Sequence, residues 1–371
     1  MLELADIFRE TGPAYREAFD SRMLPSHLKA MRDIEACRTP ALGGHLRACD
    51  QCDTLQYSYH SCRNRHCPKC HTDQTARWLE RQQSRLPACP YFLVTFTLPA
   101  ELRRLARSHQ KLVYGLLMSA AARALLKLTA DPRYLGARPG GLAVLHTWTR
   151  ALAYHPHAHF LVTAGGWRDG PSPGWVAPKR ADFLVPGRAL SVLFRGILRD
   201  ALRKAGLYDQ VPAAVWQKNW VVHLQHAGTG QAALGYLARY VYRVALPNSR
   251  LERFENGRVT FRYRDNRSGK IQHCTLHTFP FIARFLQHVL PAGFSKVRSY
   301  GVFSPSQKPL LDRVRAALLA ASPDPAPEPA DIIDAPVPPV TGHDPKLPPC
   351  PSCGLGRMRL IETLPRWRPP P

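Results

Sequence analysis

The stretch Tyr154-His-Pro-His-Ala-His-Phe-Leu-Val-Thr-Ala-Gly-Gly166 contains the clearest strand signal of the chain, over Ala158–Ala164. Side chains two positions apart share one face of a strand, so His157 and His159 point the same way and can bind one metal ion. A chain with this many histidines holds about 0.7 such pairs by chance. The pair alone is therefore weak evidence, and partly buried, hydrogen-bonded histidines explain it as well.

Further short segments are rich in β-branched or aromatic residues and predict strands at Tyr91–Leu98, Leu142–Thr149, Trp220–Gln225, Arg258–Arg264 and Ile271–Leu276. Helical periodicity is clearest over residues 100–128, 188–206, 230–243 and 278–290. Strands and helices alternate irregularly, and no glycine-rich phosphate loop follows a strand. We therefore expect an α+β fold with a mainly antiparallel sheet.

The predicted helix at 230–243 carries Tyr236 and Tyr240 at positions i and i+4, which lie on one face of a helix. A tyrosine stripe at this spacing usually belongs to a core. Arg239 and Arg243 flank the pair, however, and suit a surface that holds phosphates. A metal ion on paired histidines that polarises a phosphodiester, together with an attacking tyrosine, would form a covalent phosphotyrosine without any need for ATP.

Seven of the ten cysteines lie between residues 37 and 89. Two C-x-x-C knuckles in this region predict one closed, tetrahedral zinc site formed by Cys49, Cys52, Cys67 and Cys70. Unliganded thiols or redox pairs are the alternative. Cys62 is left over, either as a substitute ligand or in a second site with a neighbour: His45, His66 or Cys37. Cys350-Pro-Ser-Cys353 in the tail is half of a site, which a residue elsewhere completes or which has no role.

The charge of the chain favours a polyanion as partner. Lys and Arg together number 51 against 27 acidic residues, a formal net charge of +24. Arg63, Arg65 and Lys69 lie beside the second knuckle and are predicted to contact DNA, although a solvated charged face would have the same sequence. A hydrophobic content of 45% excludes a wholly disordered chain.

The length of 371 residues exceeds what one core usually supports, so several modules are expected. Composition divides the chain into an N-terminal helical segment, a zinc-binding domain, a catalytic domain, and a proline-rich linker with a tail, at 1–36, 37–89, 90–320 and 321–371. We find no run of about 20 apolar residues and no secretory signal pattern. We expect a cytoplasmic protein, nucleoid-associated when bound to DNA, whose reduced cysteines bind metal.

Taken in their order along the chain, the motifs resemble those of the HUH-type, two-tyrosine rolling-circle transposases of the insertion-sequence-91 family. The matching segments are Cys37-Arg-Thr-Pro-Ala-Leu-Gly-Gly-His45, Cys49-x-x-Cys52, Ser61-Cys-Arg-Asn-Arg-His-Cys-Pro-Lys-Cys70, Leu145-His-Thr-Trp148, His155-Pro-His-Ala-His159 and Tyr236-Leu-Ala-Arg-Tyr240. Segments 284–294 and 298–301 also look like the family. The order of the motifs is far more specific than any one of them.

The resemblance implies an HUH-endonuclease-like central antiparallel sheet with helices, preceded by a small zinc-binding domain. It implies that His157 and His159 hold Mg²⁺ or Mn²⁺, and that Tyr236 and Tyr240 are the nucleophiles. Its substrates would be single-stranded DNA at the element ends and target DNA. Candidates for a third metal ligand are Gln231, His155 and Gln225. Tyr242 lies on a different helix face and is not assigned a role.

Two other functions compete with a transposase. The first is a catalytically decayed zinc-ribbon protein that binds DNA without forming a covalent adduct. The second is a metal-dependent hydrolase, but such enzymes usually extend the histidine motif with further acidic or histidine ligands. Here Phe160-Leu-Val follows the histidines instead.

Overall fold

The computed structural model describes residues 2–70, 86–229, 244–265, 268–321 and 347–367, which form two units that we treat separately. The N-terminal unit comprises Met1–Cys70 together with Pro323–Pro371. The second unit comprises His71–Ser322, and we call it the catalytic unit after the catalytic domain predicted for this region. The tail therefore joins the N-terminal unit, whereas composition divided the chain into four successive regions. The proline-rich stretch at 322–346 lies outside the described residues.

The N-terminal unit pairs two helices with a three-stranded sheet. Helices α1 (Leu4–Phe19) and α2 (Pro25–Ala36) bury apolar side chains at helical spacing, among them Ile7 and Phe8 on α1. The antiparallel sheet has the order β13-β1-β2, and its strands are β1 (Gly44–Cys49), β2 (Leu55–Tyr59) and β13 (Met358–Leu364). Strand β2 is largely exposed, so this sheet buries little apolar surface.

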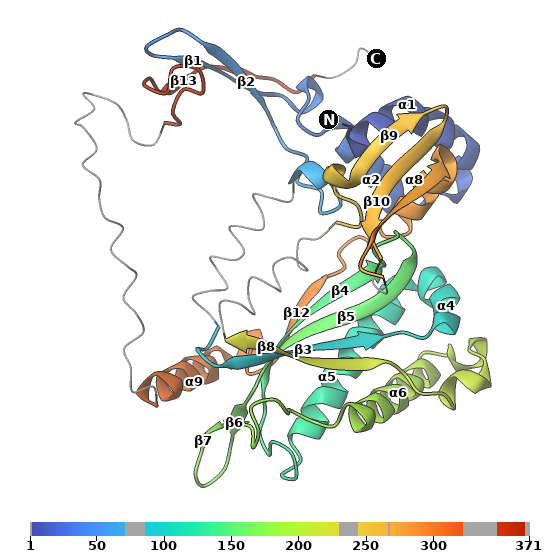
Figure 1. Ribbon diagram of the computed structural model, residues 1–371, viewed down its shortest axis with the longest axis vertical. Coiled ribbons are helices and arrows are strands. Elements are labelled where there is room, and N and C mark those ends of the chain that lie inside the picture. The colour runs from blue at the N-terminus through green and yellow to red at the C-terminus, as the bar shows by residue number, and fades with distance from the viewer. Residues whose placement is uncertain (1, 71–85, 230–243, 266–267, 322–346, 368–371) are drawn as a thin grey trace. The chain divides into compact units, whose positions relative to one another are not determined.

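The catalytic unit is built on a five-stranded, fully antiparallel sheet with the order β12-β4-β5-β3-β8 (Figure 1). Its strands are β3 (Pro90–Thr97), β4 (Gly140–Trp148), β5 (Tyr154–Thr163), β8 (Val222–Thr229) and β12 (Val297–Gly301). The expectation of an α+β fold with a mainly antiparallel sheet is confirmed. Strand β12 was not predicted, because only Val297 and Tyr300 among its five residues are β-branched or aromatic.

Helices α4 (Arg103–Ser108), α5 (Gln110–Thr129) and α6 (Gly187–Lys204) cover one face of the sheet. The predicted helix at 100–128 is broken at His109, whose backbone leaves the helical region with φ −123° and ψ 47°. By length and composition alone, helix α5 is long and apolar enough to cross a membrane, although its sequence is not an unbroken apolar run. Its apolar side chains pack into the core against the sheet and α6, which accounts for this composition.

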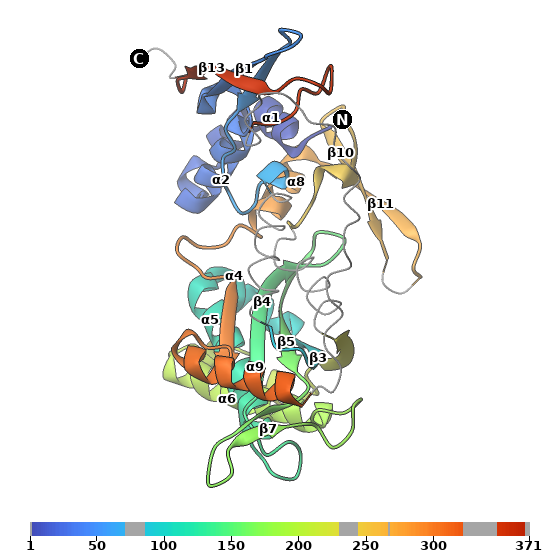
Figure 2. The ribbon, with the colours of Figure 1, turned by 90° about the vertical axis from the view of Figure 1, so that its left-hand side faces the viewer.

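Helix α9 (Lys308–Ala320) lies on the opposite face, where Leu311 and Val314 pack with Leu142 and Leu161 of the sheet (Figure 2). A short ribbon pairs β6 (Gly166–Arg168) with β7 (Gly174–Val176). A separate sheet has the order β11-β10-β9, and its strands are β9 (Leu251–Glu255), β10 (Arg258–Arg264) and β11 (Ile271–His277). Helix α8 (Thr278–Leu286) packs against this sheet through Phe281, which contacts Phe261.

Candidate metal centres

Three histidines meet on the sheet face that carries α9. The ring nitrogens of His146, His157 and His159 all lie within 4.8 Å of one another. The register of β4 and β5 places His146 directly opposite His157, while His159 follows two residues later on the same face. The sequence therefore paired His157 and His159 correctly in space, and strand pairing adds His146 to them.

The partner of each ring sets which nitrogen is offered to a metal. Nδ1 of His157 lies 2.7 Å from the backbone oxygen of His155, and because a carbonyl only accepts, Nδ1 carries the proton. Burial lowers the pKa of His157 to about 4, so the ring is neutral near pH 7. Its Nε2 is then a lone-pair donor, the form that binds metal.

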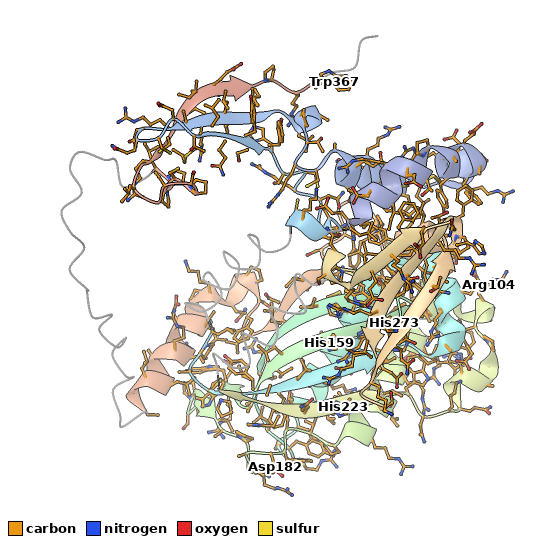
Figure 3. All side chains as sticks on the ribbon, turned by 45° about the horizontal axis from the view of Figure 1, so that its top comes forward. Arg104, His159, Asp182, His223, His273 and Trp367 are labelled. Carbon is orange, nitrogen blue, oxygen red and sulfur yellow. The ribbon has the colours of Figure 1, made fainter. Side chains whose placement is uncertain are left out.

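The other two rings are also held by neighbours. Thr95 Oγ1 on β3 lies 3.0 Å from Nδ1 of His159, and strand pairing sets Thr95 opposite His159. The ring of His146 stacks on Trp148, with centroids 4.7 Å apart. His146 and His159 are buried, and Figure 3 shows His159 on the sheet, apart from His223 on edge strand β8. The cluster is therefore positioned by core strands and not by loops.

Two of the three predicted third ligands, His155 and Gln225, do not belong to this cluster. Nδ1 of His155 lies 2.8 Å from the Arg103 guanidinium, and burial followed by that charge lowers the pKa of His155. Gln225 is an exposed residue of β8 and lies opposite Leu93 of β3. Gln231 lies outside the described residues. His146 is the third member of the cluster. The available signal was the pairing of the predicted strand Leu142–Thr149 with the strand that follows the histidine motif.

The predicted nucleophiles and their flanking arginines fall within residues 230–243, outside the described part of the chain: Tyr236, Tyr240, Tyr242, Arg239 and Arg243. Their roles stay predictions.

Eight of the ten cysteines lie in two clusters of four. The predicted single site is therefore wrong, because its four cysteines belong to two different clusters. One cluster consists of Cys37, Cys62, Cys67 and Cys70, and the other of Cys49, Cys52, Cys350 and Cys353. The reason is topological. The knuckle of Cys49 and Cys52 lies at the end of β1, which pairs with β13 of the tail. The knuckle of Cys67 and Cys70 instead lies at a 3-10 turn, Pro68–Cys70. The tail half-site is thereby completed.

In the first cluster the Sγ atom of Cys70 lies 3.5 Å from that of Cys37 and 3.6 Å from that of Cys62. Backbone N–H groups of Cys62 and Asn64 donate to the sulfurs of Cys37 and Cys62, respectively. Hydrogen bonds, chiefly from Cys62, lower the pKa of Cys37 to about 7. Four sulfurs at this spacing suit a closed, structural zinc site.

The predicted DNA-contacting residues of this unit differ in their surroundings. Arg63 is exposed, and Arg65 is partly buried. Lys69 Nζ lies 2.5 Å from a carboxylate oxygen of Glu3, so its charge is largely compensated within the unit. Arg63 is therefore the best placed of the three to reach a phosphate.

Sequence reasoning missed a basic cavity of about 340 Å³ in the catalytic unit. Its lining consists of Arg150, Arg250, Arg262, Tyr263, Arg264 and Ile271. The Arg250 side chain donates to the backbone oxygens of Arg150 and Arg262, which anchors it beside the hairpin of β10 and β11. The alternation of Arg258, Arg262 and Arg264 along one predicted strand was the available signal.

Comparison with known proteins finds two family matches along the chain. A family described as "Transposase zinc-binding domain" matches residues 7–98, and one described as "Putative transposase" matches residues 140–309. The "Putative transposase y4qJ" of Sinorhizobium fredii is 39% identical over all of this chain and 97% of its own length. The "Transposase for insertion sequence element IS801" of Pseudomonas savastanoi pv. phaseolicola is 29% identical over 86% of this chain and 84% of its own.

No solved structure matches the chain. The relatives cover nearly the whole sequence, and both family matches coincide with the motifs that carried the resemblance. The chain belongs to the insertion-sequence-91 family of transposases.

Proposed function

We propose that this transposase cuts and joins single DNA strands in a rolling-circle reaction, through 5′-phosphotyrosine intermediates formed in an HUH-type catalytic domain. The observation that carries the proposal is the cluster of His146, His157 and His159 on one face of a central antiparallel sheet. His146 and His159 are buried, and burial lowers the pKa of His157 to about 4, which keeps that ring neutral near pH 7. Three such protein ligands suit a catalytic metal, because they would leave coordination positions open for substrate.

The three histidines would hold a divalent cation that neutralises and polarises the scissile phosphate. Imidazole nitrogens are better ligands for Mn²⁺ than for Mg²⁺, which prefers an all-oxygen environment, so we expect Mn²⁺ to support the reaction better. The hydroxyl of Thr95 and the carbonyl of His155 hold two of the rings through Nδ1, which would leave their Nε2 atoms available to bind the cation.

The tyrosines supply the covalent step. The phenol oxygen of Tyr236 or Tyr240 attacks the phosphorus, the new O–P bond replaces the bond to the 3′ oxygen, and the phenol proton passes by way of solvent to that leaving oxygen. One phosphodiester is exchanged for another, so no nucleotide is consumed. With two tyrosines, one can hold a 5′ end while the other cuts a second strand.

Basic side chains would hold the DNA backbone. On the N-terminal unit these are Arg63, Arg65 and Lys69, and Arg239 and Arg243 flank the proposed nucleophiles. The arginine-lined cavity beside β10 and β11 adds a further phosphate-binding surface in the catalytic unit. Because each neutralised phosphate releases counterions, we expect binding of single-stranded DNA to weaken steeply as salt rises.

The proposal is tested by incubating the chain with labelled single-stranded element ends and Mn²⁺, followed by a denaturing gel. Wild type should give a covalent protein–DNA band. His157→Ala should abolish the band while retaining most of the salt-sensitive binding. His226→Ala should leave the band unchanged, because His226 is exposed on edge strand β8 and lies opposite Phe92, whose side chain is on the α5/α6 face of the sheet.

Tyr236→Phe and Tyr240→Phe should each impair the reaction, and the double variant should give no adduct, since phenylalanine lacks the attacking oxygen. Tyr242→Phe is the matched control and should react like wild type. Wild-type adduct yield in the double variant would contradict the assignment of the nucleophiles. Binding with no adduct from wild type would instead identify a decayed DNA-binding protein.

A further inference from the structure

We propose that Cys49, Cys52, Cys350 and Cys353 bind a second zinc ion, which fastens the C-terminal tail of the chain to its N-terminal unit. The four sulfurs lie within 4.8 Å of one another. Cys49 Sγ is 3.7 Å from Cys353 Sγ, and Cys52 Sγ is 3.8 Å from Cys350 Sγ. A tetrahedron with Zn–S bonds of about 2.3 Å has sulfur–sulfur edges of about 3.8 Å. The spacing is therefore that of a tetrathiolate zinc site.

The turns around these cysteines present N–H groups to sulfur. The backbone N–H of Gln51 donates to Cys49 Sγ, and that of Ser352 donates to Cys350 Sγ, each at 3.4 Å. The N–H of Gly356 donates to Cys353 Sγ, also at 3.4 Å. Such donors favour the thiolate over the thiol, and the thiolate is the form that coordinates metal. The two C-x-x-C segments thus have equivalent turns although they come from opposite ends of the chain.

The tail fits closely against the first knuckle. A Cβ atom added to Gly356 would lie 2.3 Å from Cys49 Sγ, so no larger residue fits there without moving the sulfur. The Asp50 carboxylate accepts the Arg357 N–H at 2.8 Å, and the Asp50 N–H donates to the Arg357 oxygen at 3.1 Å. These bonds set the two halves of the site in register.

The sheet shows why this junction needs a metal. Strand β13 pairs with all of β1, from Gly44 with Leu364 to Cys49 with Met358, and makes β1 the central strand. Without β13, only a two-stranded hairpin would remain, which is marginal in water. The apolar cluster at the junction is small, with Met358 packed among the cysteines. Coordination of zinc would supply the free energy that this core lacks.

Zinc content of the full chain tests the proposal. All chains in this test carry His157→Ala, so that the histidine centre adds no zinc to the count. The chain with all its cysteines should retain two zinc ions after dialysis, measured by elemental analysis. Cys350→Ser/Cys353→Ser should retain one, in the cluster of Cys37, Cys62, Cys67 and Cys70. The matched control Cys274→Ser, which alters a cysteine outside both clusters, should retain two. One zinc in the chain with all its cysteines, or two in the tail variant, would overturn the second site.

Loss of both ions from the tail variant would leave open a general unfolding of the unit, so a second measurement keeps the wild-type ligands. A specific protease site is inserted into the proline-rich stretch 323–346 and cut after zinc loading. The tail fragment should co-elute with the rest of the chain in gel filtration and separate on chelation. Separation with both ions still bound, or co-elution that survives removal of both, would contradict a zinc-dependent attachment.

Discussion

The histidine centre and the tail-bound cysteine cluster assemble by opposite routes. His146, His157 and His159 project from adjacent strands of a sheet whose two faces pack against α5, α6 and α9. The four cysteines come from turns next to a largely exposed hairpin and a tail strand. The apolar core alone therefore brings the three histidines together, whereas the proposed cysteine site would depend on metal binding for its own formation.

The largest expected effect separates activity from folding. His159→Ala should lower adduct formation by about 10³-fold, because several kcal/mol of transition-state stabilisation are lost with the metal. The same variant should keep the far-ultraviolet circular dichroism of wild type and unfold cooperatively, since the core strands remain. Loss of the folded spectrum would show that the histidine centre is not preorganised by the sheet.

Chelation should have the opposite consequence. Removing zinc from the full chain should increase amide hydrogen exchange throughout β1, β2 and β13 by at least about 100-fold, because the metal supplies much of the folding free energy there. Amides of β3, β4 and β5 should keep their protection. Equal loss of protection in both sheets would break the comparison between the two regions.

An intermediate effect is expected from the support of the histidine rings. Thr95→Val removes the hydroxyl 3.0 Å from Nδ1 of His159 with little change in volume. We expect Mn²⁺ affinity to fall about 10–100-fold, the usual cost of losing a partner that orients a metal-binding ring. Thr95→Ser keeps the hydroxyl and should restore most of the affinity, measured by titration calorimetry. A Thr95→Val affinity equal to wild type would remove Thr95 from the site.

A separate prediction concerns pH. Burial lowers the pKa of His288 to about 4, and the ring lies 3.1 Å from the Leu152 oxygen and 3.2 Å from Thr147 Oγ1. With a folded pKa below the unfolded value of about 6.5, the unfolded state takes up the proton first as pH falls. Stability of the catalytic unit should decline between pH 6.5 and 4 and level off below.

The contribution from His288 is about 3 kcal/mol over that range. Denaturant unfolding at several pH values checks it, and His288→Gln should give a shallower decline than wild type even if its absolute stability is lower. An unchanged slope in His288→Gln would show that other groups carry the pH dependence.

Local patterns predicted the parts of this molecule that local physics determines. Short runs rich in β-branched or aromatic residues predicted β3 and β5, and the two-residue period of a strand placed His157 and His159 on one face. His146 needed the register of two strands, which no single segment contains. The partners of Cys49 and Cys52 lie some 300 residues away in the sequence, so spacing within the knuckle region favoured the wrong pair, Cys67 and Cys70.

The most direct test of the account is electron paramagnetic resonance of Mn²⁺ bound to the full, zinc-loaded chain. One Mn²⁺ per chain should show hyperfine coupling to three imidazole nitrogens. His146→Ala should lose one of these couplings and bind more weakly, and His226→Ala, on the other face of the sheet, should match wild type. Mn²⁺ bound with unchanged affinity and unchanged nitrogen coupling in His146→Ala would contradict a metal centre built from His146, His157 and His159.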